Sequence, residues 1–295
     1  MDLRAYLDQR RELVDNALNQ VLPPDEAGGQ ILKAMRYSLF AGGKRVRPIL
    51  CLAACEAVGG RMEEAMYCAC ALEMVHTYSL VHDDLPAMDD DDFRRSVPTN
   101  HKVFGEGMAV LAGDGLLTQA MVLLCDPKYT ADLDSSRVLR AARTVMHASG
   151  YEGMVGGQAA DLAAEQAEPD LALVQFIHAM KTGALLAASV QSGAILGGAS
   201  NQDEKALLRY GRRVGLAFQV ADDLLDITGS SEELGKKVGM DEARGKMTYP
   251  GVAGPAAARE AGLRLVAEAV DIIADLGPKA EPLTLIARYI MERTN

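Results

Sequence analysis

The sequence contains no tryptophan, and its aromatic residues together make up only 5% of 295 positions. Alternating apolar and polar runs rich in β-branched residues, which are typical of half-buried strands, are scarce as well. These absences argue against a β-sandwich. Apolar residues nevertheless reach 49%, with Ala, Leu and Met prominent, so the composition predicts a core packed from helices.

Basic residues are fewer than acidic ones: the chain has 30 Lys and Arg residues and 41 Asp and Glu residues, which gives a net charge of −11. Binding to nucleic acid is therefore not expected, since a phosphate backbone needs a cation-rich face. Small phosphorylated ligands are not excluded, because a local basic cluster can hold them, as can metal ions that bridge to carboxylates.

Paired cysteines are also missing: the chain has an odd number, and no two form a C-x-x-C motif. We therefore expect reduced thiols inside a helical core, as in a cytoplasmic protein. The first fifteen residues, "MDLRAYLDQRRELVD", are charged and amphipathic, unlike a signal peptide. The cysteines in question are Cys51, Cys55, Cys68, Cys70 and Cys125.

A charge-free stretch, residues 182–202, is the one segment that imitates a membrane span. It also contains Gln191, Ser189, Ser192 and four glycines, which dilute its hydropathy. We interpret it as a helix buried on all sides, and predict no membrane span.

Helical spacing runs through most of the chain. Between Met62 and Asp83, for example, a single face recurs every three or four residues. The breaks between such segments are short Gly and Pro connectors, with no linker, repeat or low-complexity segment. The pattern predicts one all-α domain over residues 1–295, a bundle of about ten helices that builds its site from facing core helices.

The stretch "VHDDLPAMDDDDFRR" crowds six aspartates into ten residues at the end of one such helix. Asp83 follows His76 by two turns on the same face, and Pro86 should break the helix so that Asp89 returns toward Asp83. Converging carboxylates repel unless a cation neutralises them, and hard oxygen ligands without Cys or paired His suit Mg²⁺. A solvated acidic loop is the alternative interpretation.

A second acidic motif, "FQVADDLLD", places Asp222 and Asp226 one turn apart, with Gln219 one turn earlier. These three share a face with Gly215 on an otherwise apolar helix, and burying such a face is expensive. A surface stripe is the alternative, although the flanking apolar residues leave little surface for it. Two such clusters, about 140 residues apart, can face each other across a bundle.

Basic residues occur in several separate places. In "AGGKRVRP", Lys44, Arg45 and Arg47 flank the start of a helix whose first turn holds Pro48, a position that favours bound phosphate. Taken alone this could be an ordinary basic turn, but separate basic groups suggest two polyanions. The other candidates are Arg94, Arg95, Lys181, Lys236 and Lys246.

Weaker signals remain open. "KTG" puts Lys181 and Thr182 at the head of the charge-free helix, and Gly183 leaves room for a close neighbour. His76 alone is more typical of a satisfied core histidine. The same interpretation is given to His101, His147 and His178.

Together these motifs resemble the trans-isoprenyl diphosphate synthases of the bacterial farnesyl or geranylgeranyl type. The resemblance covers nearly the whole chain. It implies the all-α isoprenoid synthase fold around a central cavity, usually as a homodimer, and the head-to-tail joining of isopentenyl diphosphate to dimethylallyl or geranyl diphosphate. The segments that carry it are "GGKRVRP", "EMVHTYSLVHDDLPAMDDDDFRR", "PTNHKVFGEGMAVLAGDGLL", "GGQAADL", "KTG", "FQVADDLLD", "GKKVGMD" and "GKMTYP".

The resemblance also implies residue roles. It assigns three Mg²⁺ ions to the two acidic motifs, and it places Thr182 and Gln219, beside Lys181, near the developing cation. Departures at Ser96, Val97 and Ala221 affect the fine-tuning of substrate choice and not the reaction. The metal set is Asp83, Asp84, Asp89, Asp222, Asp223 and Asp226; the allylic diphosphate set is Arg94, Lys181, Lys236 and Lys246; the isopentenyl diphosphate set is Lys44, Arg47, His76 and Arg95.

Product length is expected to depend on Tyr78, five residues before Asp83 and about 7.5 Å further down the helix axis. Spacing alone aligns Ser79 better with Asp83. The resemblance is what points to Tyr78, since an aromatic residue there looks like the cavity floor of farnesyl diphosphate synthases. Farnesyl diphosphate is therefore the expected product, with geranylgeranyl diphosphate as the alternative.

Other classes fit less well. A terpene cyclase would carry an Asn/Ser/Glu second motif and would leave "GGKRVRP" without a diphosphate. A metal phosphohydrolase built on the His82–Asp83 dyad would need further clustered histidines. A non-catalytic regulatory subunit would tend to lose one acidic motif, and a Ca²⁺ loop would need a glycine at its turn.

Overall fold

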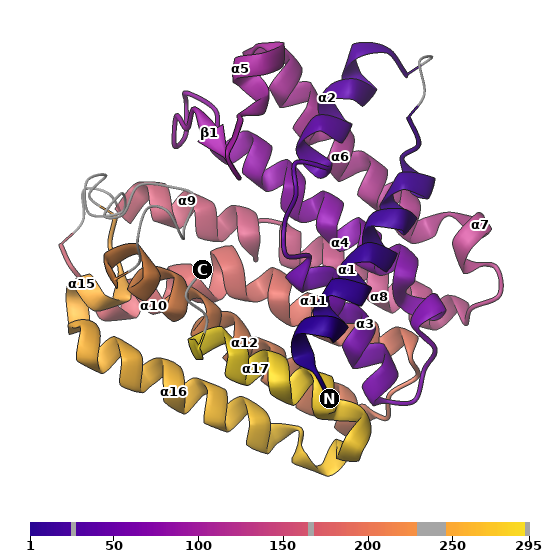
Figure 1. Cartoon of the computed structure of the whole chain (residues 1–295), viewed down its shortest axis with the longest axis vertical. Helices are drawn as coiled ribbons and strands as arrows, with labels where there is room; N and C mark the ends of the chain where they lie inside the picture. The colour runs from indigo at the N-terminus through magenta and orange to yellow at the C-terminus, as the bar shows by residue number, and fades with distance from the viewer. Residues whose placement is uncertain (25–27, 165–167, 229–245, 293–295) are drawn as a thin grey trace.

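The computed structural model describes residues 1–24, 28–164, 168–228 and 246–292, and these residues are mostly helical (Figure 1). The all-α prediction is confirmed. The sequence did not indicate the two-residue ribbon of β1 and β2, which pairs Arg94 with Val97. The elements are α1 (Leu3–Val21), α2 (Gly29–Leu39), α3 (Val46–Ala57), α4 (Met62–Asp83), β1 (Phe93–Arg94), β2 (Val97–Pro98), α5 (Asn100–Phe104), α6 (Glu106–Cys125), α7 (Pro127–Thr130), α8 (Ser135–Ser149), α9 (Met154–Ala164), α10 (Leu171–Ile177), the π-helix η2 (His178–Gly183), α11 (Ala184–Leu196), α12 (Asn201–Thr228), α15 (Tyr249–Ala253), α16 (Pro255–Ile272), the 3₁₀ helix η3 (Ala274–Ala280) and α17 (Glu281–Glu292).

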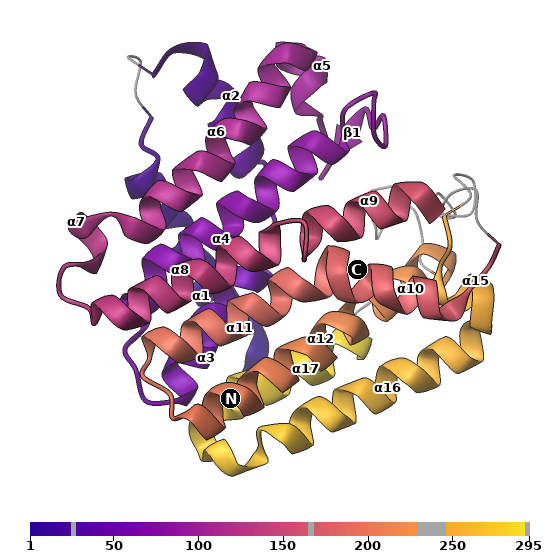
Figure 2. The same ribbon diagram turned by 180° about the vertical axis from the view of Figure 1, so that it is seen from behind.

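Helix α11 lies at the centre of the bundle, packed against α3, α8 and α12 (Figure 2). Small residues allow these backbones to touch. A Cβ atom added at Gly193 would lie 2.0 Å from the carbonyl oxygen of Cys51 on α3. A side chain there would push the two helices apart, so the glycine fixes their crossing.

Helix α4 packs against α6 and α3 and carries the first acidic motif at its end. Every residue from Ala69 to Val75 is buried, so the helix is enclosed on nearly all sides and not on one face only. Its start is capped by Glu64, whose side chain accepts a hydrogen bond from the Arg61 backbone N–H at 3.0 Å. Because the helix is anchored along its length, the position of Asp83 at its last turn is well defined.

By length and composition alone, two described helical stretches could cross a membrane: Glu106–Cys125 and Leu171–Leu196. The charge-free segment in the sequence overlaps the second stretch only. Within it, Leu185 to Val190 are all buried, as the prediction of an enclosed helix requires. Helix α6, in contrast, leaves Leu111 and Val122 more than half exposed.

The five cysteines are all free thiols. Four of them are buried among the helices, as predicted. Cys125 is exposed at the end of α6, so the expectation of a core position is wrong for that residue.

Candidate functional site

The first acidic motif forms a tight turn where α4 ends. The backbone N–H of Asp89 donates to the carbonyl oxygen of Asp83 at 2.8 Å, so the chain does return on itself after Pro86 as predicted. Burial raises the pKa of Asp83 to about 6; Lys181 opposes this rise, and the neighbouring Asp89 adds to it. Asp83 therefore stands at the end of α4 as a buried carboxyl whose charged form would be stabilised by a cation.

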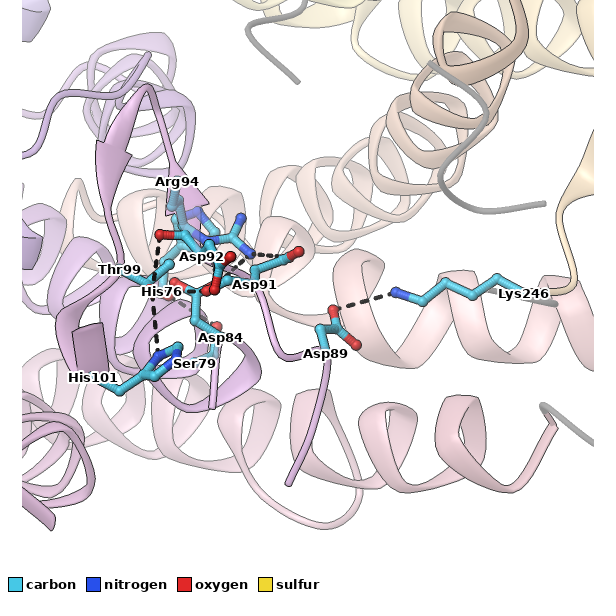
Figure 3. Close-up of polar contacts among 10 residues, drawn as sticks. All are labelled: His76, Ser79, Asp84, Asp89, Asp91, Asp92, Arg94, Thr99, His101 and Lys246. Atoms are coloured by element: carbon cyan, nitrogen blue, oxygen red, sulfur yellow. Dashed lines mark hydrogen bonds and ion pairs between the residues drawn. The ribbon is translucent and has the colours of Figure 1, made fainter. Parts of the chain in front are cut away.

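Asp84 is held on the other side of the turn by Arg94 of the β1–β2 ribbon (Figure 3). The Nε atom of Arg94 donates to Oδ1 of Asp84 at 2.7 Å, and the Asp84 residue is only 3% exposed. Arg94 also lies 3.6 Å from Asp91. A guanidinium thus already neutralises Asp84, and the metal role assigned to Asp84 stays a prediction.

Two lysines approach the remaining carboxylates. Lys246 reaches across from the chain segment before α15, and its Nζ lies 3.3 Å from Oδ2 of Asp89 (Figure 3). Lys181 of η2 pairs with Asp161 of α9 at 2.6 Å. Burial alone would lower the pKa of Lys181, but Asp161 and Asp83 more than offset it, so the pKa is raised. The third predicted lysine, Lys236, lies outside the described residues.

The second acidic motif lies on α12, where Asp223 and Asp226 are buried. Asp223 accepts hydrogen bonds from the backbone N–H of Tyr249 at 2.8 Å and from the side-chain amide of Gln219 at 3.1 Å. The oxygen of that amide accepts from the hydroxyl of Thr182 at 2.8 Å. Thr182 and Gln219, both predicted site residues, are therefore in direct contact.

Gly183 has a close neighbour, as predicted: the backbones of η2 and α12 approach so closely that a Cβ atom on Gly215 would lie 2.7 Å from the Gly183 Cα. One feature of this region differs from the sequence-based expectations. His178, interpreted as an ordinary core histidine, has its Nε2 3.2 Å from Oδ2 of Asp223. In the sequence, only its position three residues before Lys181, on the same helix face, could have linked His178 to the site, and such a spacing is common in any helix.

Arg47, His76 and Arg95 lie near one another and form a cationic pocket, in which Arg47 and His76 line one cavity and Arg95 borders the next. Burial lowers the pKa of His76 well below its usual value, and the charges of Arg47 and Arg95 lower it further. Burial also lowers the pKa of Arg47 to about 10, with Arg95 pushing in the same direction. Buried positive charge that is not fully balanced favours an anion, so three residues of the predicted isopentenyl diphosphate set are brought together.

Arg45 does not belong to this pocket, although the sequence grouped it with Arg47. It has a left-handed backbone, with φ of 53°, and its guanidinium turns into the core. There it binds Glu73 at 2.7 Å, Asp15 at 2.8 Å and the carbonyl oxygen of Leu39 at 2.8 Å. The expectation of a phosphate-binding Arg45 is therefore wrong, because two carboxylates already neutralise it.

Lys44, the remaining member of that set, is exposed and lines a separate groove with Arg11 and Phe218. The structure does not place it in the cavity that holds Arg47. Helix α3 begins at Val46, so Pro48 does fall in the first turn as predicted.

A cavity of about 400 Å³ brings together Arg47, Asp83 and Lys181, and a smaller one of about 90 Å³ adjoins it. Lys181 and Thr182 border both. The larger cavity includes Tyr78, which is 6% exposed and packs edge-on against His82 with 5.8 Å between ring centroids. Its lining includes Arg47, His76, Tyr78, Ser79, Asp83, Met88, Met154 and Leu162; that of the smaller includes Asp161, His178, Gln219, Asp223 and Lys246.

The donor atoms fit a hard cation that a phosphorylated ligand helps to hold. Among the described residues, no group of three or more His, Cys, Asp or Glu side chains is placed to bind an ion without help. Mg²⁺ does not need such a group, since it often takes one or two carboxylates and completes its shell with phosphate oxygens and water. The raised pKa of Asp83 marks a carboxylate that would be stabilised by such a charge.

Comparison with known proteins supports this chemistry. The polyprenyl synthetase family profile matches residues 29–271. The chain is 50% identical to a dimethylallyltranstransferase from Fischerella ambigua, covering all of this chain and 84% of that protein. It is 46% identical to a geranylgeranyl diphosphate synthase from Cyanophora paradoxa, covering all of this chain and 97% of that one.

Solved structures agree. The crystal structure of an FPP/GFPP synthase from Zymomonas mobilis has a TM-score of 0.86 and 37% sequence identity, covering 98% of this chain and 99% of that one.

Proposed function

We propose that this protein makes farnesyl diphosphate. The chain belongs to the polyprenyl synthetase family, and it is a prenyltransferase that condenses isopentenyl diphosphate with an allylic diphosphate. The observation that carries the proposed product is the position of Tyr78. Its ring lines the cavity below Asp83, where the growing chain would run. A bulky side chain at that depth limits the length that fits.

We assign the allylic diphosphate to the carboxylate side of the cavity, beside Asp83 and Asp89. Lys181 and Lys246 supply positive charge there. Mg²⁺ ions, three by family resemblance, would be held by Asp83 and Asp89 from one motif and by Asp222 and Asp226 from the other. When bound, they withdraw electron density from the leaving diphosphate.

Isopentenyl diphosphate fits the pocket of Arg47, His76 and Arg95. His76 stays neutral there because its pKa is lowered, so it donates a hydrogen bond without adding charge. The two arginines can bind phosphate oxygens in bidentate fashion. The two substrates would then enter from opposite sides of one cavity.

In the reaction, the allylic carbon–oxygen bond breaks and the diphosphate leaves with both electrons. The double bond of isopentenyl diphosphate supplies the electrons for the new carbon–carbon bond, and a proton is then lost. Thr182 and Gln219 lie where the cation would form, and apolar side chains such as Met88 and Met154 keep water away. In this scheme the released diphosphate takes the proton.

Geranylgeranyl diphosphate is the second candidate product. Its support is that curated relatives at 46–48% identity carry that name. Against it stands Tyr78, whose ring lines the cavity into which a longer chain would have to extend.

We further propose that two copies of the chain associate. Helices α6, α8 and α9 expose large apolar side chains that water solvates poorly, and a second copy would cover them. The exposed residues are Val110, Leu111, Val122, Leu139, Met146 and Val155.

The free cysteines are consistent with a cytoplasmic location.

Product analysis tests the proposal. The purified protein is incubated with Mg²⁺, labelled isopentenyl diphosphate and either dimethylallyl or geranyl diphosphate. The products are then dephosphorylated and separated by chromatography. Farnesol as the main alcohol supports the proposal, and geranylgeraniol as the main alcohol supports the second candidate.

Other outcomes would point to other classes. Cyclic hydrocarbons would indicate a terpene cyclase, and release of phosphate without condensation would indicate a phosphohydrolase. Binding of both substrates without any product would indicate a non-catalytic regulatory subunit. Any of these would overturn the proposed function.

A further inference from the structure

His178 is a buried histidine that the proposed chemistry does not use. It begins the π-helix η2 and is 5% exposed. Its Nε2 lies 3.2 Å from Oδ2 of Asp223, while its Nδ1 is enclosed without a hydrogen-bond partner among the described residues. A buried imidazole with a single polar contact is worth explaining, because each unmade hydrogen bond destabilises the fold.

Asp223 is a hub that joins three parts of the chain. Its Oδ2 atom lies 3.2 Å from Nε2 of His178 on η2 and accepts from the backbone N–H of Tyr249, the first residue of α15. Its Oδ1 atom accepts from Gln219, one turn earlier on α12. Three polar contacts at one buried carboxylate leave it little freedom to rotate, so each contact also helps to fix the others.

The hub positions Lys246 at the allylic side of the cavity. Lys246 precedes Tyr249 by three residues, and its Nζ lies 3.3 Å from Asp89 of the first acidic motif. Gln219 donates to Asp223 through its amide nitrogen, and its amide oxygen accepts a hydrogen bond from the hydroxyl of Thr182. The orientation of Asp223 therefore also affects the position of Thr182. A loss of order at Asp223 would therefore reach Lys246, Thr182 and Gln219 together.

The cationic pocket lies outside this network. Arg47, His76 and Arg95 come from α3, α4 and the turn after β1, and none of the hub's described hydrogen bonds reaches them. A defect at the hub should therefore act on one substrate and spare the other.

We propose that His178 is a positioning residue for the allylic diphosphate: it holds Asp223 in the orientation that fixes Tyr249 and, through it, Lys246. This inference rests on the proposed function, since it assigns a role within the same site. The role assigned to His178 is to act through Asp223 and not by direct contact with a substrate.

A matched pair of substitutions tests the proposal. In His178→Gln the side-chain amide nitrogen can take the place of Nε2 and still donate to Asp223. In His178→Asn the amide is shorter, matches Nδ1, and falls short of Asp223. His147→Asn is the control, because His147 is exposed on α8.

The readout is the Michaelis constant of each substrate, with the other saturating. For His178→Asn we expect the constant for the allylic diphosphate to rise about ten- to a hundredfold, the loss typical of one hydrogen bond to a charged group. The constant for isopentenyl diphosphate should change less than about threefold, within the scatter of such effects. His178→Gln should recover most of the loss, and His147→Asn should match the wild type.

A double variant tests the route through Lys246. If His178 acts by positioning Lys246, adding His178→Asn to Lys246→Met should raise the allylic constant little beyond Lys246→Met alone. Full additivity, equal rises for both substrates, or a lowered melting temperature with unchanged constants would each overturn the inference. A wild-type protein without condensing activity would instead overturn the proposed function, so the two failures are distinguishable.

Discussion

The Nζ atom of Lys246 lies 3.3 Å from Oδ2 of Asp89, which joins chain segments 157 residues apart at one side of the cavity. The contact closes the site between the turn after α4 and the segment that leads into α15. It also places an ammonium group against the carboxylates that would receive metal ions and diphosphate. When substrate binds, the Lys246 ammonium can turn from Asp89 to a diphosphate oxygen, and Asp89 can turn from Lys246 to a metal ion.

The carboxylates at the two motifs are expected to be essential for turnover. Asp83→Asn or Asp222→Asn should lower the turnover number by several orders of magnitude, because each removes a charge that the leaving diphosphate and its Mg²⁺ require. Initial rates at limiting and saturating Mg²⁺ measure this. Far-UV circular dichroism should show unchanged helix content, and Asp132→Asn, exposed before α8, is the control. A near-wild-type rate at limiting Mg²⁺ would contradict the metal role.

The two diphosphate sites should respond separately to substitution. Arg47→Ala should raise the Michaelis constant for isopentenyl diphosphate more than that for the allylic substrate, and Lys246→Ala should do the reverse. Each loss removes one charge-assisted hydrogen bond, so changes of about ten- to a hundredfold are expected. Steady-state kinetics with each substrate varied provides the measurement, and Arg212→Ala, exposed on α12, is the control. Equal effects on both substrates in both variants would show that the assignment is wrong.

The buried pair of Arg45 and Glu73 should contribute strongly to the stability of the fold. Both side chains are 2% exposed, and their atoms lie 2.7 Å apart. Glu73→Ala leaves a buried guanidinium short of one carboxylate, so the free energy of unfolding should fall by about 3–5 kcal/mol. Urea titration at fixed protein concentration measures it. The exposed pair of Arg11 and Asp8 is the control, and Arg11→Ala should change stability by less than about 1 kcal/mol. A loss no larger than this control's would contradict the prediction.

Stability should fall on the acid side because of His76. Its pKa in the folded protein is lowered, so the unfolded chain binds a proton that the folded chain excludes once the pH drops below about 6.5. The free energy of unfolding should therefore decrease as the pH falls, by at most about 1.4 kcal/mol per pH unit from this residue. Asp83 has a raised pKa and contributes with the opposite sign, since its contribution to stability is lost as the pH rises through about 6.

Comparison with His76→Gln isolates the histidine, because Asp83 is present in both proteins. Urea titrations at pH 5.5 and 7.5 should show a larger acid loss for the wild type than for the variant. Equal losses in the two proteins would mean that His76 is protonated in the folded state.

The helical fold and the two acidic motifs were predictable because their signals are local. Helical spacing shows in the sequence wherever one face is apolar, and Pro86 marks the turn that brings Asp89 back to Asp83. The different fates of Arg45 and Arg47 were not predictable. They are two residues apart in one basic motif, and only the left-handed backbone at Arg45 turns its guanidinium to Glu73 and Asp15.

The same limit applies to His178 and Asp84. The partners of both residues are set by tertiary structure: Asp223 is 45 positions from His178, and Arg94 reaches Asp84 through a ribbon with no strand-like run in the sequence. A residue-type pattern can show that a group is available for chemistry. It cannot show which neighbouring charge the fold will place against it.

Tyr78 is expected to set the product length. Its ring is buried below Asp83 against His82, and burial raises the pKa of its hydroxyl to about 12, with the charge of Asp83 adding to the rise. Tyr78→Ala removes the ring and deepens the cavity, so the product should shift from farnesyl toward geranylgeranyl diphosphate or longer chains. Chromatography of the dephosphorylated products measures the shift. Tyr151→Ala, at a residue 80% exposed, is the control and should leave the profile unchanged. An unchanged profile in a folded, active Tyr78→Ala protein would refute the floor, and Ser79, which lines the same cavity one position later, would be the next residue to enlarge or test.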